Sequence, residues 1–137
     1  MNNYSIEEKL PSLKEYLLLR EAAGWSVSDN EVMERGLDNS VYCVCAVANS
    51  TVIGMSRLIG DHGLVYFVAD TIVLPEYQNQ GIGTQLMEGI MSYLEKNAPA
   101  NSFITLMSAK GREGFYEKFG FFKRPNDDYG HGMMVEL

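Results

Sequence analysis

The stretch Asp70-Thr71-Ile72-Val73-Leu74-Pro75-Glu76-Tyr77-Gln78-Asn79-Gln80-Gly81-Ile82-Gly83-Thr84 decides the fold. An apolar strand runs into a short polar loop, and two glycines then stand at the start of an amphipathic helix. The first N–H groups of a helix have no partner within it and carry partial positive charge. Glycine lets a ligand approach the backbone closely. The stretch therefore predicts an anion site suited to phosphate groups.

Two commoner phosphate-binding motifs are excluded at this loop. The dinucleotide fingerprint G-x-G-x-x-G requires glycine at position 86, which is Leu86. The nucleoside triphosphate loop requires Gly-Lys-Ser or Gly-Lys-Thr, and the sequence contains neither. What remains is Gln-x-x-Gly-x-Gly, from Gln78 to Gly83, directly after a strand.

Hydrophobic patterns on both sides of the loop predict the elements around it. Apolar residues at helical spacing predict a helix over about 83–96. Upstream, the runs 41–47, 51–59 and 64–74 are separated by turn residues and predict an antiparallel meander. Downstream, we expect a strand over 102–107, a helix over 112–119, a strand beginning at Phe121-Phe122 and a last strand over 133–137.

Two capping boxes predict short helices before the meander. Ser12-Leu13-Lys14-Glu15 opens the first, with Gly24 as its stop, and Ser28-Asp29-Asn30-Glu31 opens the second. In the second helix we expect Val32, Met33 and Leu37 to face inward. Helices, then a meander, then alternating strands and helices predict an α/β fold with a mixed sheet and helices on both faces.

Length and composition predict a single domain over residues 1–137, with 46% apolar and 21% charged residues. No apolar run approaches the roughly 18 residues that cross a bilayer, and the N-terminus lacks the basic and then apolar pattern of a signal peptide. We therefore expect a cytoplasmic protein without a membrane partner.

The only cysteines, Cys43 and Cys45, are expected to be buried thiols, and no metal site is expected.

The net charge of −7 argues against nucleic acid as a partner, because the 11 Lys and Arg residues are scattered and phosphate binding needs a basic stripe. An acidic surface can attract protonated amines. It also serves solubility, which is the more general explanation.

A second motif lies downstream, in Leu106-Met107-Ser108-Ala109-Lys110-Gly111-Arg112-Glu113-Gly114-Phe115-Tyr116-Glu117-Lys118-Phe119-Gly120-Phe121. This segment and Gln78–Gly83 resemble two ordered motifs of the GNAT superfamily of N-acetyltransferases, and the chain resembles its small bacterial-type members over nearly its whole length. The resemblance implies a mostly antiparallel mixed sheet of six to seven strands. It also implies transfer of the acetyl group of acetyl-CoA to a primary amine, by direct attack in a ternary complex.

The resemblance assigns the acetyl-CoA site to the loop amides and to the preceding strand, where splayed strands leave backbone groups such as the Val73 N–H able to polarise the thioester. The residues implied in binding are Ile72, Val73, Leu74, Gln78, Asn79, Gln80, Gly81, Ile82, Gly83, Thr84 and Tyr116. The family commonly has glycine or a basic residue between Gln78 and Gly81. Here Asn79 and Gln80 carry no positive charge, so binding rests more on backbone amides.

Two residues are candidates for the proton transfers. By resemblance, Tyr116 protonates the leaving thiolate, which agrees with the chemistry of a phenol whose pKa is about 10; the alternative is a core aromatic. An alkyl amine with a pKa of about 10.4 must lose a proton before it attacks. Asp70 is the first candidate base. Its alternative is a structural anchor for the early helices, and ordered water can replace a single base.

The acceptor is left open by the sequence. In this superfamily the early helices and loops select the amine, and Trp25 either stacks on it or packs as a plug between helices. An arylalkylamine, a polyamine, an aminoglycoside or a peptide amine all fit. The competing class is an acetyl-CoA-binding sensor without activity. A homodimer is typical of such small enzymes, but no stretch of the sequence identifies an interface.

Overall fold

The computed structural model describes residues 3–137. They fall into two compact units, one ending at Leu106 and the other formed by Met107–Leu137. Among the helices of residues 3–137, none combines the length and apolar character needed to cross a membrane. The prediction of a single domain over the whole chain stays a prediction.

The first unit is built on a five-stranded sheet in the order β1-β2-β3-β4-β5. The strands are β1 (Ser5–Glu8), β2 (Tyr42–Ala48), β3 (Thr51–Gly60), β4 (Val65–Val73) and β5 (Phe103–Leu106). The first four pair antiparallel, which confirms the meander, and β5 pairs parallel with β4. The pattern did not predict β1, because four residues with one apolar side chain carry no periodicity and become a strand by pairing with β2.

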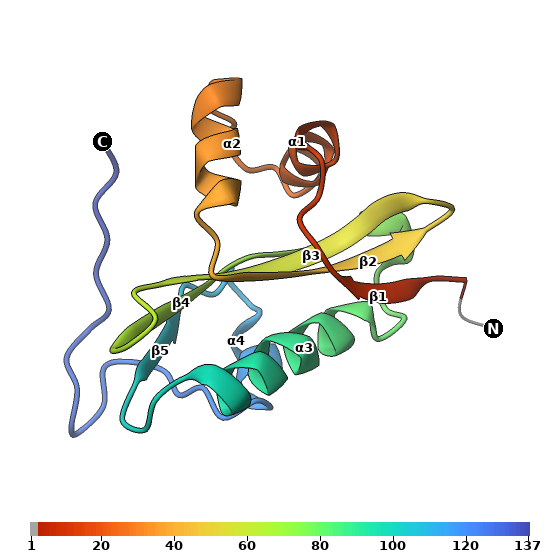
Figure 1. The fold of residues 1–137 in the computed structure, drawn as a ribbon. Coiled ribbons are helices and arrows are strands. Elements are labelled where there is room, and N and C mark those ends of the chain that lie inside the picture. The colour runs from red at the N-terminus through yellow and green to blue at the C-terminus, as the bar shows by residue number, and fades with distance from the viewer. Residues whose placement is uncertain (1–2) are drawn as a thin grey trace. The chain divides into compact units, whose positions relative to one another are not determined.

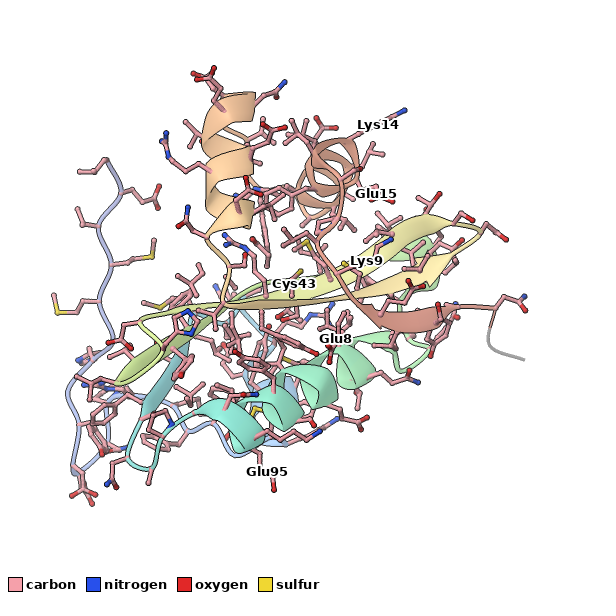
Figure 2. All side chains as sticks on the ribbon, in the orientation of Figure 1. Glu8, Lys9, Lys14, Glu15, Cys43 and Glu95 are labelled. Atoms are coloured by element: carbon pink, nitrogen blue, oxygen red, sulfur yellow. The ribbon has the colours of Figure 1, made fainter. Side chains whose placement is uncertain are left out.

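Two helices cover one face of this sheet and a third covers the other (Figure 1). Helices α1 (Leu13–Ala22) and α2 (Asn30–Asp38) lie on one face, and α3 (Ile82–Asn97) lies on the opposite face. The core under α1 and α2 includes Cys43, which is labelled in Figure 2. The buried side chains of this core are Tyr16, Leu19, Met33, Leu37, Cys43, Cys45, Val52, Met55 and Ile72.

The two predicted helix starts have different outcomes. The Ser12 hydroxyl accepts a hydrogen bond from the Glu15 amide, and the Glu15 carboxylate accepts one from the Ser12 amide, so the first capping box is confirmed. The second is wrong: Asp29 is the N-cap of α2 and makes no side-chain cap hydrogen bond. In α2, Met33 and Leu37 are buried as expected, but Val32 is 44% exposed because it points away from the stripe that they form.

Helix α3 presents an apolar stripe to the sheet, with Leu86, Met87, Ile90 and Leu94 buried. Its other side is polar, and Figure 2 shows Glu95 pointing away from the sheet. Gly89 faces β2, where a Cβ would be in ordinary contact with a Val44 methyl group at 3.4 Å. This packing fixes the start of α3, and with it the loop that precedes the helix, at the end of β4.

Strand β4 contains a bulge at Asp70. Met55 pairs with Ile72 and Arg57 with Ala69, so two steps along β3 correspond to three steps along β4. Asp70 has a φ of 53°, in the left-handed region where Asp and Asn are enriched among non-glycine residues. The extra residue lets the side chain of Asp70 turn toward α1 while that of its neighbour Thr71 contacts Met87 of α3.

The second unit contains one short helix, α4 (Glu113–Glu117). Within the described residues 3–137 the sheet has five strands, so the expectation of six to seven is wrong, and the strands expected from Phe121 and over 133–137 are absent. The stretch after Phe122 favours turns: the Asn126 side chain accepts hydrogen bonds from the Asp128 and Tyr129 amides at 2.9 Å. Such local bonds compete with a strand ladder.

Candidate functional site

The pairing of β4 with β5 ends before β4 itself does. The parallel pairing runs from Val65 with Phe103 to Val68 with Leu106, and β4 continues to Val73 beyond it. The last five residues of β4, 69–73, therefore have no pairing partner on that side among the residues of the first unit. A splay of β4 and β5 would require the pairing to end in this way, and the splay itself stays a prediction. An elongated ligand can pair with this edge as an added strand would.

The amide of Val73 points away from β3. The Leu74 amide donates to the Ile53 carbonyl at 2.9 Å, so Leu74 turns its backbone groups toward β3. Successive residues of an antiparallel strand alternate in this direction, so the N–H and C=O of Val73 point away from β3. The Val73 carbonyl accepts a hydrogen bond of 2.9 Å from Nε2 of Gln78. The family resemblance gives the Val73 N–H the role of a polarising donor, and that role stays a prediction.

The loop after β4 is curled by two residues in the left-handed region. A short 3₁₀ helix, η1 (Pro75–Tyr77), leads into it. Asn79 has a φ of 63° and Gly81 a φ of 83°. Left-handed residues next to right-handed ones turn successive N–H groups toward one centre and create an anion-binding concavity. The side chain of Gln78 holds the loop in this form by its hydrogen bond to β4.

The start of α3 fits a diphosphate. Gly81 is the N-cap, no side chain caps the helix, and no acidic residue stands in its first turn. The N–H groups of this turn therefore keep their partial positive charge for a ligand. A Cβ on Gly81 would have no heavy atom within 4 Å, which shows that the space above the loop is open. The residues present fit the diphosphate of coenzyme A at the segment from Gln78 to Thr84.

Asp70 lies at the centre of a buried charge cluster that sequence analysis did not find. Its Oδ2 accepts hydrogen bonds from the Tyr16 hydroxyl at 2.5 Å and from Nε of Arg57 at 2.7 Å. Its Oδ1 accepts one from Arg20 at 2.9 Å. The side chain of Asp70 is only 6% exposed. The one signal in the sequence was Arg57, because a charge inside an apolar strand needs a buried partner.

The pKa shifts in this cluster follow from burial and from the carboxylate. Burial, and then the hydrogen bond to Asp70, raise the pKa of Tyr16, so its hydroxyl stays a donor. Burial alone would lower the pKa of Arg57, but its hydrogen bond to Asp70 and the negative charge outweigh this, and the pKa is raised. Three donors already occupy an acceptor with about four lone-pair positions. These contacts favour the anchoring role that was the alternative for Asp70.

Tyr116 belongs to the second unit, on α4. Its ring makes edge contacts with Phe115, at 5.1 Å between centroids, and with Phe121, at 6.3 Å. The side chain is half-buried, so these aromatic neighbours set the direction of the ring. The motif from Phe115 to Phe121 therefore forms a local cluster around Tyr116. Its role as the acid stays a prediction.

Trp25 follows the end of α1 and is 37% exposed. The guanidinium carbon of Arg20 lies 5.6 Å from the centroid of its ring. The indole is thus neither fully buried as a plug nor free on the surface, but covered on one side by a cation.

The chain is similar to known acetyltransferases over most of its length. Residues 7–134 match the family model of the acetyltransferase (GNAT) domain. A probable acetyltransferase of unknown function from meticillin-resistant Staphylococcus aureus has 33% identity and a TM-score of 0.88, over 98% of this chain and 99% of that one. A GNAT-family acetyltransferase from Streptococcus pneumoniae has 31% identity and a TM-score of 0.79, over 98% of this chain and 97% of that one.

A curated relative extends the likeness beyond bacteria. The uncharacterised N-acetyltransferase ycf52 of Pyropia yezoensis is 27% identical over 127 residues, which are 90% of this chain and 72% of that protein. The match thus includes the early helices, the sheet, the loop at the start of α3 and the segment around Tyr116. The chain belongs to the GNAT superfamily of N-acetyltransferases, and its reaction is the transfer of an acetyl group.

Proposed function

We propose that this protein transfers the acetyl group of acetyl-CoA to a primary amine of a small molecule, by direct attack in a ternary complex. The observation that carries the proposal is that two features follow each other in the chain. Residues 69–73 of β4 do not pair with β5, and they lead directly into the start of α3, which no side chain caps. An extended pantetheine arm fits the first, and a diphosphate fits the second. Acetyl-CoA supplies a thioester, which an amine can attack without a covalent enzyme intermediate.

The chain contributes binding, orientation and proton transfer. The backbone of Ile72, Val73 and Leu74 would align the pantetheine arm, and the amides from Gln78 to Thr84 would hold the diphosphate. The N–H of Val73 would donate to the thioester oxygen as negative charge develops there, in the manner of an oxyanion hole. Tyr116 would protonate the leaving sulfur.

The amine would arrive from the face of the sheet that α1 and α2 cover, because a ligand bound at the start of α3 occupies the opposite face. Since three donors surround the carboxylate of Asp70, we propose that ordered water removes the proton of the amine and that Asp70 is not a dedicated base. Asp70→Asn would then retain the rise of activity with pH; a sharp loss of activity at high pH would assign the base to Asp70.

Calorimetric titration with acetyl-CoA tests the proposal, followed by thiol release with 2-phenylethylamine, spermidine, an aminoglycoside and a peptide with a free N-terminus. We expect binding, and thiol release with one class of small amine. Binding without release from any amine would favour an acetyl-CoA sensor, and release with the peptide alone would favour a protein amine. Absence of binding would contradict the site from Gln78 to Thr84.

A further inference from the structure

Arg20 connects three separate parts of the first unit. Its Nε donates to the Ser26 carbonyl at 2.9 Å, and its NH1 group donates to Oδ1 of Asp70, also at 2.9 Å. Its guanidinium also covers the ring of Trp25. One side chain on the last turn of α1 therefore holds the segment after that helix to the bulge of β4.

Arg57 uses the other oxygen of the same carboxylate for a different connection. Its Nε donates to Oδ2 of Asp70 at 2.7 Å. Its NH1 group donates to the Gly36 carbonyl at 3.1 Å and to the Ser40 hydroxyl at 3.2 Å, at the end of α2. Besides its bond from Tyr16 on α1, Asp70 thus serves two arginine-mediated connections, one to the Trp25–Ser26 segment and one to the end of α2.

We propose that Asp70 is a positioning residue which, through Arg20, holds the Trp25–Ser26 segment beside β4 and so sets the affinity for the amine. The effect on the amine rests on the proposed function, whereas the connection itself does not. Asp70 precedes Val73 by three residues, a separation of about 10 Å along a strand. The segment is therefore held to β4 three residues before the donor that would polarise the thioester, on the face where the proposed function brings the amine.

The connection depends on charge and on the shape of the guanidinium. Arg20 is partly buried, with a side-chain exposure of 20%, and needs a carboxylate beside it. It uses two different nitrogens for Ser26 and Asp70, which a planar guanidinium can do and a lysine ammonium cannot do in the same geometry. The exposed side of Trp25, which Arg20 does not cover, is the surface left for an amine.

Trp25 is the sole tryptophan of the chain, so its fluorescence reports on this segment alone. The variant Arg20→Lys keeps the positive charge beside Asp70 and removes the simultaneous bond to Ser26. We expect it to raise the acrylamide quenching constant of Trp25 about twofold, because the segment opens more often. Asp70→Asn is also expected to raise the quenching constant of Trp25. Asparagine is chosen because it tolerates the left-handed backbone at this position.

The matched control is Arg57→Lys, the same substitution on the other side of the same carboxylate. It loosens the end of α2 and is expected to leave the quenching of Trp25 at the wild-type value. In the double variant of Asp70→Asn with Arg20→Lys, the quenching of Trp25 is expected to rise no further than in the single variants. Both substitutions weaken the same connection, which runs from Asp70 through Arg20 to the Trp25–Ser26 segment.

In the acetylation assay, Arg20→Lys is expected to raise KM for the amine about tenfold and to leave turnover at saturating amine and the Kd of acetyl-CoA within about twofold of wild type. A general loss of structure would change all three. Circular dichroism identifies a variant that fails to fold, and Arg20→Lys then carries the test without Asp70→Asn.

Unchanged Trp25 quenching in Arg20→Lys would overturn the proposal. So would an Asp70→Asn variant that folds, keeps its Trp25 quenching and loses turnover even at saturating amine, because Asp70 would then act on the proton of the amine itself. If the wild-type protein acetylates none of the amines, the proposed function fails, and the quenching comparison still decides whether the connection exists.

Discussion

At the scale of single residues, the proposed function assigns the protonation of the leaving sulfur to Tyr116. In Tyr116→Phe the ring and its contacts with Phe115 and Phe121 remain, and only the hydroxyl is lost. We expect kcat to fall about 100-fold, the usual range for loss of a general acid, with little change in acetyl-CoA affinity. Steady-state thiol release and calorimetry measure the two quantities.

Tyr129→Phe is the control for this change, since it removes a hydroxyl from another aromatic pair of the same unit. It is expected to leave kcat unaltered. If Tyr116→Phe turns over as fast as wild type, Tyr116 is a packing residue and another group protonates the sulfur.

At the scale of single elements, the start of α3 depends on one glycine. Gly81 has a φ of 83°, where a side chain is strained by about 1–2 kcal/mol. A methyl group there would have no heavy atom of the described residues within 4 Å, so it would occupy space that is open to a ligand. We therefore expect Gly81→Ala to weaken acetyl-CoA binding about tenfold, equivalent to about 1.4 kcal/mol. Calorimetry measures the loss.

Gly24→Ala is the control for Gly81→Ala, because it introduces similar backbone strain away from the proposed ligand site. Gly24 has a φ of 74° and equally open surroundings, but it lies after α1. Its substitution is expected to cost similar stability and to leave acetyl-CoA affinity unchanged. Equal affinities in the two variants would argue that the diphosphate does not lie on the Gly81 loop.

The capping box of α1 also connects that helix to the sheet. Oε1 of Glu15 accepts a hydrogen bond from the Ser12 amide, and Oε2 accepts one from the Val52 amide of β3, both at 2.8 Å. Burial alone would raise the pKa of Glu15, but the bonds from the Val52 and Ser12 amides outweigh it, and the pKa falls below the ordinary 4.5. The ionised carboxylate therefore stabilises the fold above that value, and the contribution is lost as the pH falls through the folded pKa.

Glu15→Gln is accordingly expected to lower the free energy of unfolding by about 1–2 kcal/mol at pH 7, since an amide has one acceptor oxygen for two donors. The difference from wild type should shrink as the pH decreases below about 4.5. Urea unfolding at several pH values measures it. Glu21→Gln, on the exposed side of the same helix, should change stability by less than about 0.5 kcal/mol, and an equal loss in both variants would contradict a specific role for Glu15.

At the scale of the whole molecule, ligand binding should raise the free energy of unfolding. The edge of β4 and the start of α3 exist only in the folded chain, so a ligand that bridges them shifts the unfolding equilibrium. Acetyl-CoA at 100 times its Kd is expected to add about 2.7 kcal/mol and to raise Tm by about 10 °C. Calorimetric scanning measures the shift.

Coenzyme A without the acetyl group should stabilise the chain to a similar extent, because it keeps the pantetheine arm and the diphosphate. Adenosine alone should stabilise it far less. If adenosine gives the same shift as acetyl-CoA, the bound part of the ligand is not the part assigned to β4 and α3.

The sequence by itself determined the elements whose cause is local. The helical stripe from Leu86 to Leu94, the meander and the Ser12 capping box follow from side-chain periodicity and from bonds between residues three or four positions apart. The loop from Gln78 to Gly83 was recognisable for the same reason, because its glycines and the helix that follows are adjacent in the chain.

Only the tertiary structure decided which distant residues meet. Strand β1 exists because it pairs with β2, and β4 beyond Val68 is not paired with β5 because the parallel ladder ends at Leu106. The partners of Asp70 come from positions as far as 54 residues away in sequence. Periodicity describes which way each side chain points along its own element. It does not determine which residues of different elements lie opposite one another. That pairing surrounds Asp70, the candidate base from the sequence, with Tyr16, Arg20 and Arg57.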